Sequence, residues 1–316
     1  MQALSFTART ISEDHLGVHL QCPRCRSKMQ GLRCSQCSVH MEMRNGIVHA
    51  LPPARAAYYA RFIADYEHIR AEEGRGSQSE EFYLSLPYKD SSGRNNSQWK
   101  IRSKSYDYLI RRVLKPLHHR GSILDLGAGN CWMSFRLALL GYSPIAVDLL
   151  TNEDDGLGAA AHFDKHLPNP IPRFQAEATH LPFQAGQFDA IIFNASFHYS
   201  EDYEATLRES LRCLKPGGLA IISDTPWYSR EESGSLMVAE RHAAFRQRFG
   251  TASNSVTSLE FLTDERLQTL AKKLSIQWTV HSPWYGLKWA MRPWISKLRH
   301  RREPSRFRIY VARKDA

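Results

Sequence analysis

The sequence has no hydrophobic run near the roughly 18 to 20 residues that a membrane-spanning helix needs. Its first fifteen residues include polar and acidic side chains where a secretory signal would be apolar. Glycine and proline, at 18 and 15 residues, are too few for a collagen-like or low-complexity chain. With 316 residues, of which 42% are hydrophobic, we expect a cytoplasmic globular protein with one large domain and a small attachment.

Acidic residues are scarce at the C-terminal end. From Lys288 onward ten basic residues stand against Glu303 and Asp315, so this segment carries +8 of the total charge of +10. Such a patch is suited to phosphates or to anionic lipid, and it is equally suited to a solvated tail.

Cysteine is also scarce, and four of the six cysteines lie close together. Two Cys-x-x-Cys turns separated by eight residues can direct four thiolates at one tetrahedral zinc ion. Two disulfides are the alternative, which a reducing cytoplasm disfavours. We therefore predict a structural zinc site, because four protein ligands leave no open position for a substrate; its ligands are Cys22, Cys25, Cys34 and Cys37. Cys131 and Cys213 are predicted to be small buried hydrophobes.

The segment around these cysteines resembles the zinc ribbons that precede or activate certain methyltransferases. Examples are the N-terminal zinc domain of bacterial ribosomal-RNA guanine methyltransferases and small activator proteins. The shared features are Cys-Pro-x-Cys, a second Cys-x-x-Cys, and Gly46-Ile47 shortly before Leu51-Pro52. The resemblance covers residues 20–53 and implies a zinc-ribbon domain over residues 1–53.

Residues 54–117 are predicted to form a helical linker or lid. Helical patterns cover 54–73 and about 97–117, and turn residues interrupt the chain between them at 74–96. A core domain over 118–316 follows.

A glycine-rich loop follows the short apolar run 122–126. Gly127 and Gly129 precede a helical pattern, so the sequence predicts a strand, a loop that approaches a ligand closely, and a helix start. Dinucleotide binding is disfavoured, because its fingerprint needs a small residue where this chain has Trp132.

Four further segments follow in order: SPIAVDLL, RFQAEATHLPF, QFDAIIFNASFHY and LKPGGLAIISD. From about residue 121 to 224 the chain therefore resembles the class I S-adenosylmethionine (SAM)-dependent methyltransferases, particularly the group with quinone and other small-molecule enzymes. The resemblance implies an α/β, Rossmann-like fold with a seven-stranded sheet.

Seven residues are predicted to bind SAM. Asp148 ends its strand, where a carboxylate can accept hydrogen bonds from both ribose hydroxyls. The resemblance places an acidic side chain near adenine at Glu177, although family members commonly have Asp there, and a backbone N–H at Ala178. It also implies a site for the methionine end of SAM, formed by Asp125, Gly127, Gly129 and Asn194.

Methyl transfer from a sulfonium needs alignment more than acid–base help. His198 follows the fourth strand and is the candidate general base; a histidine that only shapes the loop is the alternative. Tyr199 and the pair Trp227-Tyr228 are candidates for the pocket or for packing. The Asn-Pro-Pro-Tyr signature of many amino-nitrogen methyltransferases is absent, because Asn194 is followed by Ala-Ser-Phe.

An insertion at about 285–305 separates the last two predicted strands, 275–281 and 307–313, which we expect to pair antiparallel. Its apolar residues Leu287, Met291, Trp294 and Leu298 recur at helical spacing beside basic side chains. An anionic membrane surface, an RNA backbone, or a helix folded onto the domain with Trp294 in its core would each fit.

Three functions follow in order of preference. The first is a SAM-dependent methyltransferase acting on a small-molecule or lipid-linked metabolite, with the ribbon orienting the N-terminal region over the active site. The second is an RNA methyltransferase that modifies a ring nitrogen. The third is a non-catalytic binding protein that uses the fold as a scaffold.

Overall fold

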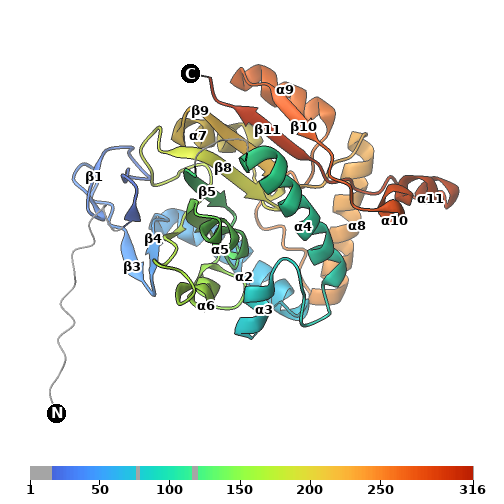
Figure 1. Ribbon diagram of the computed structural model, residues 1–316, viewed down its shortest axis with the longest axis horizontal. Helices are drawn as coiled ribbons and strands as arrows, with labels where there is room; N and C mark the ends of the chain where they lie inside the picture. Colours follow the sequence, from blue (N-terminus) through green and yellow to red (C-terminus); the bar gives the residue numbers. More distant parts are fainter. Residues whose placement is uncertain (1–15, 76–78, 116–119, 316) are drawn as a thin grey trace, which may run out of the picture.

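A nine-stranded sheet forms the centre of the molecule in the computed structural model, which describes residues 16–75, 79–115 and 120–315. The strand order is β10-β11-β9-β8-β5-β6-β7-β4-β3 (Figure 1). The strand bounds are β3 (Glu42–Arg44), β4 (Ile47–His49), β5 (Ser122–Leu126), β6 (Ser143–Asp148), β7 (Arg173–Gln175), β8 (Phe188–Asn194), β9 (Leu214–Ser223), β10 (Trp278–His281) and β11 (Ile309–Arg313).

Strands β5 to β9 run parallel, and β11 runs antiparallel to both β9 and β10. The predicted α/β Rossmann-like sheet and its antiparallel last pair are therefore confirmed. Strand β5 lies between β6 and β8. The chain builds the sheet outward on one side of β5 through β6 and β7, and then continues on the other side through β8 and β9. In open α/β sheets, ligands bind outside the carboxyl ends of the strands at such a point.

Helices cover both faces of the sheet (Figure 1). Local sequence sets several of their ends: Pro53 occupies the first turn of α2, and the side chains of Ser79, Asp202 and Thr263 cap α3, α7 and α9. The helix bounds are α2 (Pro53–Glu72), α3 (Glu80–Ser85), α4 (Asn96–Tyr108), α5 (Trp132–Leu139), α6 (Ala161–Asp164), α7 (Tyr203–Cys213), α8 (Glu231–Phe249), α9 (Asp264–Leu274), α10 (Leu287–Ala290) and α11 (Arg292–Leu298). The single-turn pieces are 3-10 helices Leu157–Ala160 and Phe197–Tyr199, and a π-helical segment Leu109–Leu114 follows α4.

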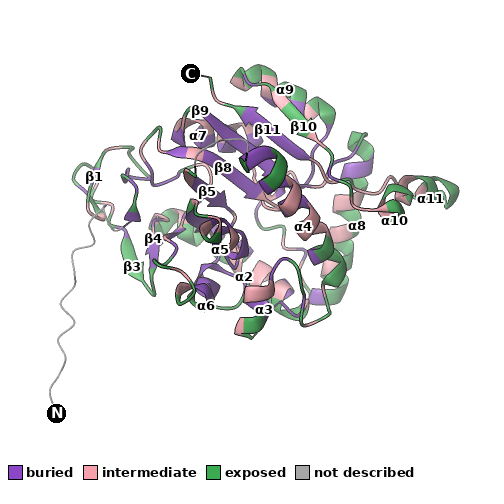
Figure 2. Ribbon diagram, viewed as in Figure 1, coloured by how far each residue is buried: buried purple, intermediate pink, exposed green. Residues whose placement is uncertain are grey.

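Two hydrophobic cores lie on the two faces of the sheet. Successive residues of β5 alternate between them, since Ile123 faces the core beneath α4 and α5 while Leu124 faces the core beneath α7 and α9. The inner strands are buried along almost their whole length (Figure 2). This explains why each inner strand is a continuous apolar run in the sequence.

The cysteine-rich segment is joined to the sheet, which we did not expect from the sequence. Its hairpin β3–β4 turns at Asn45-Gly46, both with positive φ, and β4 pairs in parallel with β7. The seven predicted strands are present as β5 to β11, and the hairpin β3–β4 extends the sheet to nine strands. A separate two-stranded sheet pairs β1 (Met29–Gln30) with β2 (Arg33–Cys34), which ends at one of the four clustered cysteines.

The segment also shares a core with the large domain. Leu20, Met41 and Val48 are fully buried in the same cluster as Phe174 and Phe183. The first part of the predicted ribbon domain, residues 1–15, lies outside the described residues. Within the described part, the ribbon and the large domain form one packed unit.

The predicted linker contains α2, α3 and α4. The apolar insertion at 285–305 forms the short helices α10 and α11, with Pro293 in the first turn of α11. Trp294 is 75% exposed, so the alternative in which it packs in a core is wrong. Within residues 16–75, 79–115 and 120–315, no helix is long and apolar enough to span a membrane.

Candidate active site

The glycine loop after β5 is held against β6 and β8. The N–H groups of Gly127 and Ala128 donate to the carbonyl of Val147 over 2.8 and 3.1 Å. A Cβ on Gly127 would lie 2.2 Å from the Cβ of Ser196, and Gly127 has a φ of +75°. Only glycine satisfies both conditions, so the close approach between this loop and the end of β8 explains that residue.

The carboxylate of Asp148 holds the other side of the glycine loop by hydrogen bonds to the backbone. One carboxylate oxygen accepts the N–H of Gly129 at 2.8 Å, and the other accepts the N–H of Leu150 at 2.9 Å. Burial raises the pKa of Asp148, although these backbone hydrogen bonds oppose the shift. Each oxygen keeps a lone pair, so the carboxylate can still accept two hydrogen bonds from a vicinal diol.

Asp125 is a buried acid with an unused acceptor. Its Oδ2 accepts from the hydroxyl of Ser134 at 2.7 Å, while Oδ1 has no partner among the residues that the structure describes. Burial raises the pKa of Asp125 to about 7. A buried carboxylate oxygen without a partner is costly, and a bound cation or donor would relieve that cost.

Two arginines face the same space from the N-terminal helices. Arg70 of α2 pairs with Asp155 at 2.5 Å. Arg102 of α4 forms no ion pair within the described part of the chain, and its guanidinium lies over the ring of Trp99 at 4.9 Å. Burial, followed by the positive charges of Arg75 and Arg70, lowers the pKa of Arg102 to about 10. An anionic group of a bound ligand would give the Arg102 guanidinium an ion-pair partner.

These groups line one cavity of about 190 Å³ beyond the carboxyl ends of β5, β6, β7 and β8. The sequence placed seven residues in a cofactor site, and the structure brings all of them to this cavity: Asp125, Gly127, Gly129, Asp148, Glu177, Ala178 and Asn194. Their individual contacts with a cofactor stay predictions.

Helix α2 forms a wall of the cavity that the sequence reasoning missed. Tyr59, Phe62 and Tyr66 line it, with Arg70 one turn further on. These residues recur at intervals of three and four, which puts them on one face of the helix. From the sequence, residues 54–73 were predicted only as a helix of the linker or lid, with no side chain assigned to the site. The apolar face flanked by arginines was the signal that could have found it.

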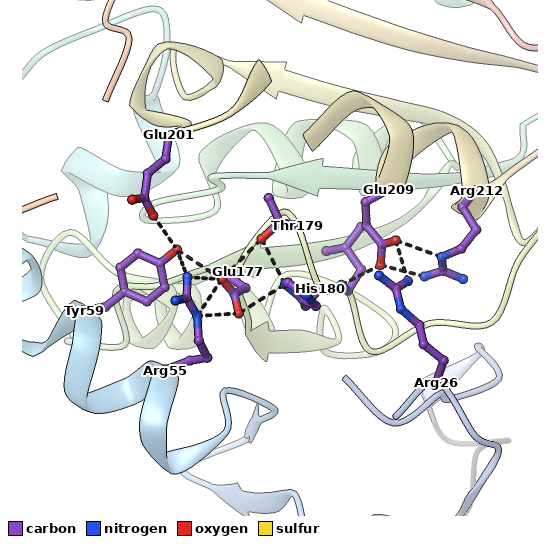
Figure 3. Close-up of polar contacts among 10 residues, drawn as sticks. Arg26, Arg55, Tyr59, Glu177, Thr179, His180, Glu201, Glu209 and Arg212 are labelled. Carbon is purple, nitrogen blue, oxygen red and sulfur yellow. Dashed lines mark hydrogen bonds and ion pairs between the residues drawn. The ribbon is translucent and has the colours of Figure 1, made fainter. Parts of the chain in front are cut away.

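Glu177 is bonded to α2 instead of facing an empty space (Figure 3). Its carboxylate accepts from Arg55 at 2.7 to 3.1 Å, from the hydroxyl of Tyr59 at 3.1 Å, and from Thr179 at 3.2 Å. The Tyr59 hydroxyl also reaches Glu201, across the cavity mouth. The predicted contact between Glu177 and adenine therefore needs these donors to share the carboxylate or to move.

We expect Arg55→Ala to lower the free energy of unfolding by about 1–3 kcal/mol, because it leaves the 97%-buried Glu177 with fewer donors. Because the Arg55 side chain is 37% exposed, solvent screens its ion pair with Glu177, and we expect the loss of free energy to lie in the lower part of that range. Urea unfolding followed by circular dichroism measures the change. Arg61→Ala is the control on the same helix, since Arg61 is 82% exposed and 3.9 Å from Asp65. Equal effects of the two substitutions would contradict the assignment.

His198 lies behind the cavity wall. Its neighbours Tyr199 and Ser200 line the cavity, whereas His198 is 92% buried and its Nδ1 has no partner among the described residues. Burial, helped by the charges of Arg241 and Arg102, lowers the pKa of His198 to about 3. Such an imidazole is a weak proton acceptor at neutral pH. The base role stays a prediction that the burial does not favour.

Trp227 and Tyr228 are packing residues. Both are buried, and neither lines the cavity. The Trp227 indole N–H donates to Asp264, and the guanidinium of Arg308 lies 3.5 Å from the centre of its ring. Cys131 and Cys213 are fully buried, as predicted.

The four clustered cysteines converge at one point, away from the cavity. Their Sγ atoms lie within 4.8 Å of one another, with separations of 3.4 Å for Cys22–Cys37 and 3.5 Å for Cys25–Cys34. Four thiolates around tetrahedral zinc at 2.3 Å are about 3.8 Å apart. All six cysteines are free thiols, so the disulfide alternative is wrong. The donor set and its spacing fit a closed zinc site.

The family model that matches this chain and two of its curated relatives are methyltransferases. Residues 124–222 match the family model described as a methyltransferase domain. The demethylmenaquinone methyltransferase of Mycolicibacterium gilvum is 31% identical over 127 residues, which cover 39% of this chain and 52% of that protein. The arsenite methyltransferase of Aquipseudomonas alcaligenes is 33% identical over 113 residues, covering 32% of each chain.

Among solved structures, the YcgJ protein from Bacillus subtilis is 17% identical with a TM-score of 0.47, covering 68% of this chain and 99% of that one. The chain spans about half the length of the quinone methyltransferase relatives, or less. Over residues 124–222, which include the glycine loop and most of strands β5 to β9, this chain contains a methyltransferase domain.

Proposed function

We propose that the protein transfers the methyl group of SAM to a small-molecule or lipid-linked acceptor. The observation that carries the proposal is the cavity in which the glycine loop, Asp148 and Asp125 meet at the switch point of the sheet. Charge and shape there fit SAM: Asp148 offers two acceptors for a ribose diol, Asp125 one acceptor for an ammonium, and Arg102 a cation for a carboxylate.

SAM supplies a methyl group on a positively charged sulfur. The residues of this chain bind and orient it: the loop at Gly127 and Gly129 leaves room for the backbone to approach, and Asp148 fixes the ribose end. Tyr59, Phe62 and Tyr66 cover the site and exclude water, so that a nucleophile can align with the methyl group at about 3 Å. This alignment requires no proton transfer to His198, which is buried outside the cavity lining.

The small-molecule acceptor is supported by the names of the relatives, which methylate demethylmenaquinone and arsenite. The largely aromatic cover of α2 suits an apolar acceptor. We also propose that the four clustered cysteines bind a structural zinc ion, because four sulfurs within 4.8 Å of one another can complete a tetrahedral site and leave no position for a substrate.

Two measurements test the proposed function. Isothermal titration calorimetry with SAM should give a one-site isotherm, whereas a nicotinamide dinucleotide should give none. Labelled methyl from SAM should then appear in the lipid or polar-metabolite fraction of a cell extract. Label confined to RNA would favour the ring-nitrogen RNA alternative, and SAM binding without any transfer would leave a scaffold role.

Binding of SAM should strengthen as the pH rises from 5 to 7. The pKa of Asp125 in the free protein is raised to about 7, so below this pH the group holds a proton that an incoming ammonium must displace. The affinity should therefore rise by up to about tenfold per pH unit and level off near pH 7.

Titrations in buffers of different ionisation enthalpy should show proton release below pH 7. Asp125→Asn keeps the hydrogen bond with Ser134 and should flatten this dependence while weakening binding. A slope that persists in the variant would assign the titration to another group.

A further inference from the structure

Exposed large apolar side chains are concentrated on one projection near the C-terminal end. We call residues 284–301, which include α10 and α11, the C-terminal projection. Figures 1 and 2 show these helices extending from the body with mostly exposed surfaces. Of the twelve exposed large hydrophobic residues among the described ones, six lie here: Trp284, Leu287, Met291, Trp294, Ile295 and Leu298. Half of the exposed apolar residues thus sit on less than a tenth of the chain.

The charge of the projection is of one sign. The sequence contains no Asp or Glu from residue 266 to residue 302. Lys288, Lys297, Arg299 and Arg301 are exposed, and none has a carboxylate partner within the part of the chain that the structure describes. Exposed aromatic and aliphatic residues therefore alternate with free cations.

The base of the projection is fastened to the domain. Trp289 stacks on Phe307 with centroids 5.6 Å apart, and the Arg292 guanidinium lies 3.8 Å from the Trp289 ring centre. Arg302 reaches Glu240 of α8 at 2.5 Å. The inner side chains thus hold the helices in place, which leaves the outer apolar residues without a partner.

We propose that the C-terminal projection docks on an anionic membrane surface. Its apolar side chains would enter the boundary between headgroups and acyl chains, with Trp284 and Trp294 at the interfacial depth that tryptophan favours. The unpaired lysines and arginines would face the lipid phosphates. The two helices together are too short to cross a bilayer, so the segment lies in the interface.

A membrane fits this surface better than RNA does. The aliphatic residues Leu287, Met291 and Leu298 are 69%, 48% and 79% exposed. RNA binding uses cations and stacking aromatics, and it gives such aliphatic side chains no favourable contact. Burial in acyl chains does, and the absence of acids avoids repulsion by anionic lipid.

The projection is connected to the cavity through α4. The hydroxyl of Tyr285 lies 2.8 Å from that of Ser105, and Lys104 donates to the Tyr285 carbonyl at 2.8 Å. Arg102, one turn earlier on α4, lines the cavity. Docking would therefore hold the cavity close to the membrane, where an apolar acceptor dissolves. This docking does not depend on the proposed methyl transfer, and it can be measured without SAM.

Vesicle co-sedimentation of the full chain tests the proposal. Vesicles of phosphatidylcholine mixed with phosphatidylglycerol should bind the protein, and vesicles of phosphatidylcholine alone should bind it much less. Changing Leu287, Trp294 and Leu298 together to serine should weaken binding by about tenfold or more, since three buried side chains are lost. Changing Lys288, Lys297 and Arg299 to glutamine should weaken binding and reduce its salt dependence.

The matched control changes three exposed apolar residues outside the projection to serine, namely Met43, Leu139 and Leu236, and should bind as the unaltered chain does. Circular dichroism melting checks that every variant is folded. Equal binding by the two serine variants would overturn the proposal. So would tight binding to ribosomal RNA that needs the cations but not the apolar residues. A dimer that the Leu287, Trp294 and Leu298 variant abolishes, without vesicle binding, would assign the face to a second copy of the chain.

Discussion

Asp148→Ala is expected to weaken SAM binding by about 100-fold or more. The carboxylate would accept two hydrogen bonds from the ribose, and a charged acceptor contributes about 1.5–3 kcal/mol for each. The substitution also removes the bonds to the N–H groups of Gly129 and Leu150, which loosens the loop proposed to contact the methionine end of SAM. Isothermal titration calorimetry of the purified variant measures the loss.

The matched control for Asp148 is Asp154→Ala. Asp154 is an exposed carboxylate in the following loop and does not line the cavity. It should bind SAM as the unaltered chain does. If Asp148→Ala keeps full affinity while folding normally, the ribose assignment is wrong, and the proposed function has to rest on other residues.

Loss of the proposed zinc ion is expected to destabilise the whole molecule. Cys34→Ser, or removal of zinc by a chelator, should lower the melting temperature by about 5–10 °C, because several kcal/mol of metal binding is coupled to folding. From the sequence alone one would expect the core domain to stay folded. The structure changes that expectation, because β4 pairs with β7 and Leu20, Met41 and Val48 share a core with Phe174.

An ion pair strengthens this coupling. Arg26, between the two cysteine pairs, lies 2.6 Å from Glu209, which is 96% buried and also binds Arg212 and the N–H of Leu181 (Figure 3). Misplacing Arg26 would leave Glu209 with one arginine fewer.

Thermal unfolding followed by circular dichroism and by zinc release measures the coupling. Both signals should change in a single transition. A chelator added to Cys34→Ser should have little further effect, and Arg24→Ala, an exposed residue in the first Cys-x-x-Cys turn, is the control. Two separate transitions, with the core melting at an unchanged temperature, would show that the ribbon is independent.

The sequence by itself indicated which segments form the inner strands and where the glycine loop lies. These are local properties: β5, β8 and β9 are apolar runs of the right length, and Gly127 must be glycine because of its positive φ. It also predicted that the four clustered cysteines converge, and their Sγ atoms do lie within 4.8 Å of one another. All seven predicted cofactor residues reach the cavity because strand ends meet at one edge of a parallel sheet.

Only the tertiary structure decided which distant segments face one another. No sequence periodicity could reveal that Arg55 and Tyr59 donate hydrogen bonds to Glu177. They precede it by 122 and 118 residues, respectively. The sequence also could not reveal that β4 pairs with β7. Backbone hydrogen bonds form between any two strands, so the residue types do not specify the partner strand. The sequence left alternatives open for His198 and Trp294, and the structure shows His198 buried and Trp294 exposed. Local chemistry fixes what each segment can be, and packing decides where its side chains go.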